Sequence, residues 1–580
     1  MVDPNKSSDP VPEVSESGDK LTIMNRSKIY HVSKKFICSS IPYFEKMFCC
    51  DLLEGKENTV QLDLDEHSFD CVLNWIHSDS VQIEIENVIA LFDVADYLML
   101  NDLSKDCYSY FHANFTIEHL PIVIPQVTKT SKLINSGSLN TFICRHFLKI
   151  VKTSIFLKYP VETVEYICKL DLMISSEYQV LEAINDWIKF KADDRKDCLL
   201  RLLKCIRWCY AGTDISLKIM VIPYIATIQD INEILCSPGN CKLGCASNRT
   251  NQCLLVSIQE TEDLILSIRV LQSHSWLPVG NFNFDDSMSL EFVHGENVSD
   301  ILYDCGTKGV RIDWEAKKFC WLNFYSDDSY YLQINKLIVC NQIASSTILY
   351  LKDNFGGCVD DPFIELFHLR LFPTSRRRHI EDGAWAHEWA EDFDFCVKSP
   401  KCHGAVKISV ENDERLLLES DGKFIVVGKS KDKHFYALFQ VRHLEWYKMK
   451  YYVDYDERTF IATVLGSNIF ILTQKLRFIQ FNYETNVYKK TAPFRDSELE
   501  FVDLIITSQQ DNNKILLVHK SSGKIHYFNI DSQTWTETSI KYRKPDQIDS
   551  NDCIMTSTTV FLPLDKINHC FKPKFSSLNL

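Results

Sequence analysis

Four cysteines lie close together between residues 236 and 253, where the chain reads CSPGNCKLGCASNRTNQC. Thiolates are preferred zinc ligands, and four of them could complete a tetrahedral site, here Cys236, Cys241, Cys245 and Cys253. The separations of five, four and eight positions lack the paired CxxC spacing of a zinc knuckle. Ordinary reduced thiols in a linker are therefore the favoured interpretation, and no metal site is predicted.

A second stretch with chemically active side chains begins with three consecutive arginines and continues as HIEDGAWAHEWAEDFDF. His379, His387 and Glu388 are candidate metal ligands, but mixed aromatic and acidic residues are more typical of an interaction loop. Loops on rigid scaffolds often carry binding residues. The stretch is predicted to be a partner-binding loop, with a solvated loop tip as the alternative; its contact residues would be Arg376, Arg377, Arg378, Trp385 and Trp389.

The motifs of common catalytic sites do not occur in this chain. It has no GxxxxGK[ST] phosphate loop, no HExxH zinc helix and no GxSxG nucleophile elbow. The sequence therefore predicts a protein that is not an enzyme and that holds no cofactor.

Composition excludes several other classes of function. The 580 residues include 78 acidic and 63 basic side chains, which gives a net charge of −15 and no basic footprint for nucleic acid. No apolar run approaches the roughly 18 residues of a membrane span, and no N-terminal segment has the pattern of a signal peptide. We therefore expect a cytoplasmic or nuclear location, where the 22 cysteines would stay reduced.

Helical and strand periods alternate between residues 36 and 103. The apolar residues of 36–48 recur at helical spacing, Val60, Leu62 and Leu64 alternate with polar residues as in a half-buried strand, and 69–76 and 88–98 return to helical spacing. Several short helices with a small sheet form an α+β module. Residues 1–18 hold three prolines and almost no apolar period, so they are predicted to be a disordered tail.

The order of these elements, and the motifs within them, resemble a BTB (POZ) domain over residues 19–115. The segment Ile41-Pro42-Tyr43-Phe44 leading to Met47-Phe48 is similar to the SPYF..MF pattern of that family, and 86–103 is similar to its ENV..LL.AADYL helix. The resemblance implies a protein-interaction module. It also implies a BTB homodimer, but 1–18 lacks the helix that such dimers exchange, so the homodimer stays open.

In BTB adaptors, a hydrophobic-x-Glu motif after this helix helps to dock a cullin-3 scaffold. Leu52-Leu53-Glu54 matches it, so the resemblance assigns Leu52 as the apolar anchor and Glu54 as the acidic partner, with Tyr43 and Phe48 as further contact surface. A buried aliphatic side chain contributes about 1.5–3 kcal/mol, whereas a charge at the rim mainly orients the partner. The alternative is that Leu52 belongs to the core and Glu54 is merely solvated.

Residues 116–235 are predicted to be all-α. Ser176 and Gln179 form a capping-box pattern ahead of an apolar face that runs from Val180 to Ile188, and Val164, Ile167 and Cys168 supply another helix. This stretch resembles the BACK domain that follows BTB in many adaptors, and an unrelated helical hairpin array is the alternative. Residues 236–253 would be a linker.

From about residue 254 to 575, short β-branched and aromatic runs alternate with polar turns, which predicts an all-β domain. Three units end in an aromatic residue, at Trp446, Tyr488 and Trp535, and earlier units end at Trp276 and Trp321. Their separations of 42 to 47 residues are typical of propeller blades. The units resemble degenerate Kelch repeats and predict a β-propeller of about six blades, with WD40-like or irregular β structure as the alternative.

The combined resemblance is to the BTB-BACK-Kelch family of Kelch-like adaptors. It implies a substrate-recognition adaptor of a cullin-3-type E3 ubiquitin ligase, whose BTB domain recruits the cullin and whose propeller holds a substrate protein of unknown identity. Two alternatives stay open. One is a non-degradative scaffold that binds cytoskeletal or transcriptional partners, and the other is an oxidase on a Kelch-type propeller, which would need a redox metal.

Overall fold

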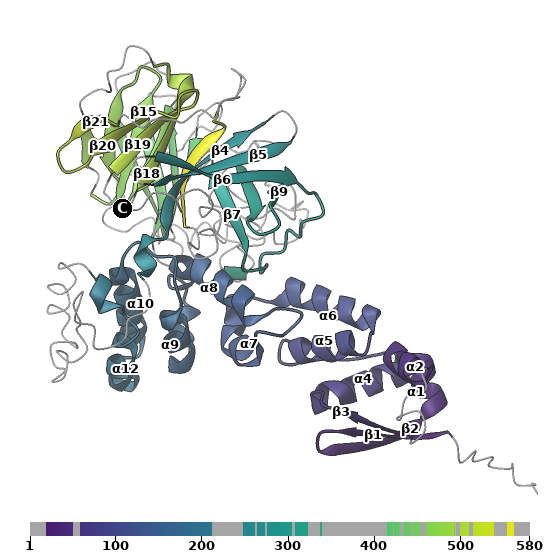
Figure 1. Ribbon diagram of the computed structural model, residues 1–580. Helices are drawn as coiled ribbons and strands as arrows, with labels where there is room; N and C mark the ends of the chain where they lie inside the picture. Colours follow the sequence, from purple (N-terminus) through teal and green to yellow (C-terminus); the bar gives the residue numbers. More distant parts are fainter. Residues whose placement is uncertain are drawn as a thin grey trace, which may run out of the picture. The chain divides into compact units, whose positions relative to one another are not determined.

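The computed structural model describes residues 19–49, 58–211, 248–322, 337–338, 415–538 and 554–561, with short gaps inside 248–322 and 415–538. The chain folds into two compact units, one made of residues 1–115 and 122–136 and the other of residues 116–121 and 137–580. The first unit combines a small sheet with helices, and the second combines helices with a series of β sheets (Figure 1). None of the helices in the described ranges has both the length and the apolar character that crossing a bilayer requires.

The sheet of the first unit has three strands. Strands β1 (Lys20–Asn25) and β2 (Lys28–Ser33) form an antiparallel hairpin, and β3 (Thr59–Leu62) pairs with β1 in parallel, giving the order β2-β1-β3. Val60 and Leu62 are buried and Gln61 is exposed, as the alternation predicted. The strand ends at Leu62 because Asp65 instead caps the next helix, where its carboxylate accepts a hydrogen bond of 2.8 Å from the backbone of Ser68.

The helices of the first unit are α1 (Lys34–Ser40), α2 (Pro42–Cys49), α4 (Glu66–Ser78), α5 (Val88–Tyr97) and α6 (Asn101–Asn114), and α7 (Leu120–Gln126) begins in the second unit. The predicted 36–48 helix is two helices, because the residue before a proline favours extended backbone and Ile41 precedes Pro42. The side chains of Ile37, Phe44 and Phe69 are fully buried and form part of the core. The α+β prediction is confirmed.

The helical part of the second unit contains α8 (Ser136–Ile150), α9 (Val161–Lys169), α10 (Glu177–Phe190), α11 (Ala192–Arg195) and α12 (Leu199–Leu203). The predicted capping box is present at the start of α10, where Ser176 and Gln179 bond reciprocally. The predicted apolar faces of α9 and α10 are buried, with Val164, Ile184 and Trp187 at most 2% exposed.

The strands of the β part pair in antiparallel fashion, with one exception in the largest sheet. Three sheets have four strands each in sequence order: β10 (Arg415–Ser420), β11 (Lys423–Lys429), β12 (His434–Val441) and β13 (Glu445–Tyr452); β14 (Phe460–Leu465), β15 (Asn468–Thr473), β16 (Phe478–Asn482) and β17 (Val487–Lys490); β18 (Leu504–Gln509), β19 (Lys514–His519), β20 (Ile525–Asn529) and β21 (Thr534–Thr538). A larger sheet has the order β22-β4-β5-β6-β9-β8-β7, with β4 (Cys253–Glu260), β5 (Ile265–Gln272), β6 (Ser275–Phe284), β7 (Val298–Tyr303), β8 (Lys308–Asp313), β9 (Lys318–Trp321) and β22 (Thr556–Phe561). A short parallel pairing of β6 with β9 joins its two halves.

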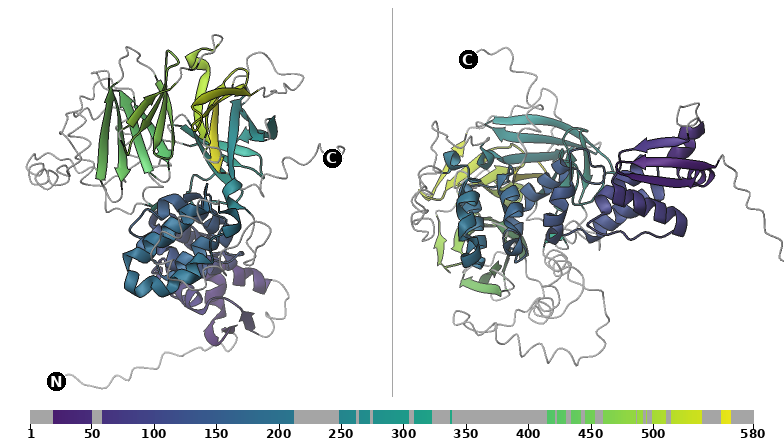
Figure 2. Two further views of the ribbon diagram at one scale, coloured as in Figure 1. Left: turned by 90° about the vertical axis from the view of Figure 1, so that its left-hand side faces the viewer. Right: turned by 90° about the horizontal axis from the view of Figure 1, so that it is seen from below.

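The first strand of each sheet contacts the first strand of the next. β10 contacts β14, β14 contacts β18, β18 contacts β22, and β22 contacts β7. The sheets stand side by side, with the helices of this unit at one end (Figure 2). Strand β22 comes from the end of the domain, yet it pairs with β4 from its beginning, so β22, β4, β5 and β6 form one half of the larger sheet. This arrangement is that of a β-propeller.

The aromatic residues that marked the repeats occupy equivalent places. Trp446, Tyr488 and Trp535 lie in the fourth strands β13, β17 and β21, Trp276 lies in β6, and Trp321 lies in β9. Strands β10, β14 and β18 are the first strands of these three sheets, and the aromatic residues lie in the last strands. The prediction of six blades stays a prediction, since residues 339–414 lie outside the described part of the chain.

Candidate protein-docking site

Two of the four residues predicted to dock cullin-3 lie on α2. Tyr43 and Phe48 are both half-buried there. Leu52 and Glu54 lie outside the described residues, in the segment 50–57 that follows α2.

Tyr43 connects α2 to the end of α5. Its hydroxyl lies 3.0 Å from the hydroxyl of Tyr97, the two ring centroids are 4.9 Å apart, and its backbone amide donates to the carbonyl of Leu98. The neighbouring Phe44 is fully buried, so it belongs to the core and is no contact residue. Tyr43 therefore presents part of its ring to solvent from a position fixed on both sides.

Phe48 is held by a cation. The ammonium of Lys34 lies 4.4 Å above the centre of the Phe48 ring, and the same nitrogen donates a 2.8 Å hydrogen bond to the side chain of Asn58. A cation over an aromatic face contributes about 0.5–1 kcal/mol at an exposed site. Phe48 and Asn58 flank the segment 50–57, so Lys34 connects the two points between which Leu52 and Glu54 lie.

Two exposed residues next to Tyr43 were missed at the level of sequence. Tyr97 is 46% exposed, and Met99 is 38% exposed with a backbone φ of 61°. The ammonium of Lys46 on α2 lies 3.2 Å from the sulfur of Met99. We call these four residues the α2–α5 face: Tyr43, Lys46, Tyr97 and Met99. The helical period gave a clue to the exposure of Tyr97. Ala95 and Leu98 lie on the apolar face of the helix, and Tyr97 lies off that face.

The described residues offer no catalytic or metal-binding constellation. No group of three or more His, Cys, Asp or Glu side chains among them could hold a metal ion. Burial raises the pKa of the Cys144 thiol to about 12 and that of Cys205 to about 11, so neither is a thiolate nucleophile near neutral pH. The predicted thiol cluster and the predicted loop 376–389 lie outside the described residues, except that Cys253 begins β4.

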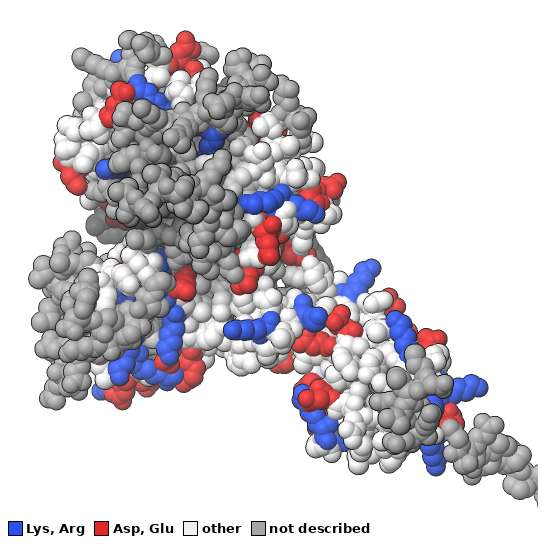
Figure 3. Space-filling model, viewed as in Figure 1, with Lys and Arg blue, Asp and Glu red and all other residues white. Residues whose placement is uncertain are grey.

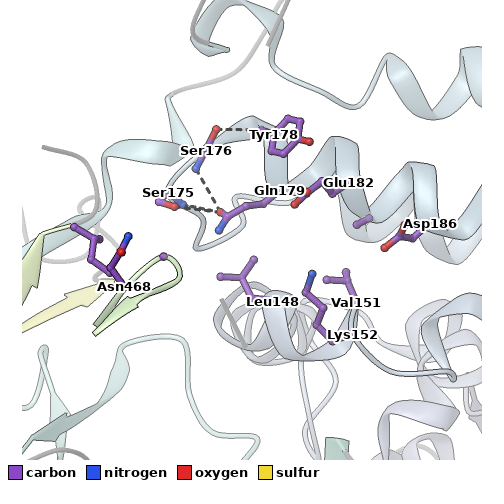
Figure 4. A pocket seen from close by; sticks show the side chains of 13 residues that line it. Leu148, Val151, Lys152, Ser175, Ser176, Tyr178, Gln179, Glu182, Asp186 and Asn468 are labelled. Carbon is purple, nitrogen blue, oxygen red and sulfur yellow. Dashed lines mark hydrogen bonds between the residues drawn. The ribbon is translucent and has the colours of Figure 1, made fainter. Parts of the chain in front are cut away.

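A cavity of about 550 Å³ lies in the second unit among α8, α10 and the turn between β14 and β15 (Figure 4). Its size is within the range of ligand pockets. The polar groups of Ser176 and Gln179 on its wall are already engaged in the cap of α10. Leu148, Val151 and Lys152 line the opposite wall.

The described surface carries charges of both signs. Basic and acidic side chains are interspersed over the face that Figure 3 presents. Arg26 and Asp63 form an ion pair of 2.6 Å. Figure 3 shows no broad basic area on the described part of that face. The exposed aromatic residues of the α2–α5 face are thus a more distinctive feature than charge.

The fold is that of a multidomain protein. Its sequence matches two family models, the BTB/POZ domain over residues 19–114 and BACK, "BTB And C-terminal Kelch", over residues 129–216. Kelch-like protein 2 of Homo sapiens is 26% identical over 191 residues, which are 32% of this chain and 32% of that protein. Kelch-like protein 17 of Homo sapiens is 25% identical over 185 residues, 31% of this chain and 28% of that protein.

The aligned part thus spans under a third of the length of these relatives. The solved BTB domain of human Gigaxonin matches 18% of this chain and 99% of its own chain, at 15% identity and a TM-score of 0.14. The BTB and BACK domains are identified from the two family models and do not depend on this structure. The chain therefore carries a BTB/POZ domain and a BACK domain, it is similar to Kelch-like proteins over this part, and its β part is consistent with a propeller.

Proposed function

We propose that this protein is a substrate adaptor of a cullin-3-type ubiquitin ligase. The α2–α5 face and the segment with Leu52 and Glu54 would bind cullin-3, and the propeller would bind the protein to be ubiquitinated. The chain would carry out no chemistry itself. It would act by raising the effective concentration of the substrate beside a ubiquitin-charged enzyme.

The observation that carries the proposal is the contact of half-buried Tyr43 on α2 with Tyr97, which is 46% exposed. Tyrosine is enriched where protein interfaces bind most strongly, because a rigid ring buries a large area at little cost in conformational entropy. Tyr43 and Tyr97 are joined through their hydroxyls, and Lys34 fixes both flanks of the segment with Leu52. These contacts support the proposal that Tyr43 and Tyr97 form part of the surface that binds cullin-3.

A pull-down of cullin-3 by the full chain tests the proposal. The original chain should retain cullin-3, Leu52→Asp should abolish retention, and Tyr97→Ala should weaken it. Losing one buried apolar side chain costs about 1.5–3 kcal/mol, which is roughly a 10- to 100-fold loss of affinity. Ile29→Ala is the matched control, since Ile29 is an exposed apolar residue of the same unit, 62% exposed, and lies on β2.

Two outcomes would contradict the proposal. If the original chain does not retain cullin-3, the non-degradative scaffold becomes the better explanation. If Tyr97→Ala and Ile29→Ala bind cullin-3 equally well, the α2–α5 face is not the contact surface, even though the adaptor role could survive through Leu52 and Glu54.

A further inference from the structure

Helix α8 binds the loop that joins β6 to β7, residues 285–297, at the border between the helical and β parts of the second unit. Phe142, Arg145 and His146 occupy one face of α8, because residues three and four apart are neighbours on a helix. The rings of Phe142 and His146 lie 5.7 and 4.7 Å from the ring of Phe292, and all three side chains are at most 3% exposed. The contact is thus a packed aromatic cluster.

Arg145 adds a polar attachment beside this cluster. Its guanidinium donates to the carbonyl of Val298 at 2.6 Å and to Nε2 of His294 at 2.7 Å. A guanidinium only donates, so Nε2 of His294 accepts, and Nδ1 carries the proton 3.2 Å from the carbonyl of Gly295. The side chain of Arg145 is 12% exposed and also lies 3.9 Å from the carboxylate of Asp300. Arg145 therefore contacts three successive points of the loop and the start of β7.

The other side of this attachment is rigid. Arg311 on β8 holds Asp300 with two hydrogen bonds of 2.7 and 3.0 Å, and it donates to the loop carbonyls of Ser289 and Glu291. The side chains of Arg311 and Asp300 are both 1% exposed. A bidentate ion pair of arginine with a carboxylate is stronger than a neutral hydrogen bond. The loop is thus fixed to the β part by Arg311 and to α8 by Arg145.

A second attachment lies at the covalent connection. Arg249, four residues before β4, forms a buried ion pair of 2.7 Å with Glu177 at the start of α10. With this attachment alone, the propeller could pivot about residues 249–252. The separate contact on α8 restricts that freedom, because a body held at two separate points can turn only about the line that joins them.

We propose that Arg145 is a positioning residue that sets the orientation in which the propeller presents a bound substrate relative to the BACK helices. The functional half of this inference rests on the proposed adaptor role. The geometric half, a single orientation of propeller and helices, does not depend on it.

Single-molecule energy transfer in the full chain tests the geometry. Fluorophores attached through unnatural amino acids at two exposed positions, Lys189 on α10 and Thr485 between β16 and β17, report the distance between the helices and the propeller. The original chain should give one narrow distribution, and Arg145→Ala should broaden it and shift its mean. Arg201→Ala is the matched control, because Arg201 is 46% exposed and pairs with Glu162 and Glu165 of the helical part.

Two further measurements separate positioning from loss of folding and from loss of the adaptor role. Amide exchange in β5 and α10 should be the same in Arg145→Ala as in the original chain, which shows that both parts remain folded. Cullin-3 retention should also be unchanged. In a reaction reconstituted with cullin-3 and ubiquitin, the lysines of the propeller that become modified should form a narrow set in the original chain and a wider set in Arg145→Ala.

An unchanged energy-transfer distribution in Arg145→Ala would overturn the inference. A broadened distribution with an unchanged set of modified lysines would overturn the positioning role. Failure of the original chain to bind cullin-3 would remove the proposed function, but it would leave the distance measurement interpretable by itself.

Discussion

The buried ion pair of Arg249 and Glu177 allows a quantitative test by the substitution Arg249→Met. Both side chains have no exposed surface, and the guanidinium meets the carboxylate through two hydrogen bonds of 2.7 and 2.8 Å. Another nitrogen of Arg249 donates to the carbonyls of Cys168 and Leu170 at 2.8 and 2.6 Å. Methionine keeps most of the side-chain volume but removes the charge and the donors.

The expected loss of stability follows from the charge of Glu177, which remains buried after the substitution. Removing one member of a buried pair leaves an uncompensated charge and costs about 3–5 kcal/mol. One factor of ten in an equilibrium constant corresponds to about 1.4 kcal/mol. Amides at the start of α10 should therefore exchange about a hundredfold to a few thousandfold faster, because local opening becomes that much more frequent.

Hydrogen exchange followed by mass spectrometry on the full chain measures this effect at peptides of α9 and α10. Arg201→Met is the control, because it breaks an exposed pair, which contributes only about 0–1 kcal/mol. The double variant Glu177→Gln with Arg249→Met should recover part of the loss, since no buried charge is left unpaired. The reasoning is refuted if Arg249→Met accelerates exchange no more than Arg201→Met does.

Three further predictions concern other parts of the chain. Burial, and then the charge of Arg145, lowers the pKa of His294 to about 4, and burial also lowers the pKa of His146 well below its usual value. Both folded-state pKa values lie below about 6.5, the usual pKa in an unfolded chain, so stability that is present at pH 7.5 falls as the pH drops through 6.5. By pH 5.5 the two histidines together should lower the free energy of unfolding by about 3 kcal/mol. Amide exchange of α8 that, after correction for pH, stays level would contradict this. Phe44→Ala should destabilise the first unit by about 3–5 kcal/mol, measured as faster exchange in β1 and α5 and disproved by exchange like that of the original chain. Asp65→Ala removes the cap of α4 and should cost about 1 kcal/mol, visible as fraying of the first turn of α4 while the exchange of α5 stays unchanged.

Local pattern was sufficient to predict the elements whose partners are near in sequence. Ser176 and Gln179 lie three residues apart, so the cap of α10 could be read directly, and the alternation around Val60 gave the buried face of β3. The aromatic residues at Trp446, Tyr488 and Trp535 gave the spacing of the sheets, because each occupies the same strand of a repeated unit.

Contacts between distant residues could not be predicted in this way. Arg249 meets Glu177 across 72 positions, and Arg145 meets His294 across 149 positions. Nothing periodic relates such residues, since the fold alone brings them together. The α2–α5 face was half predicted for the same reason: the resemblance pointed to Tyr43, but its contact with Tyr97 depends on how α2 packs against the end of α5.

The pairing of β22 with β4 has a consequence for synthesis of the protein. The ribosome synthesises the chain from its N-terminus, so β4 emerges some three hundred residues before its partner β22. Until then β4 offers an unpaired edge, which is a template for association with other chains. A premature stop codon just before residue 556 would therefore damage the propeller far more than the few lost residues suggest, and newly made chains should depend on chaperones until translation is nearly complete.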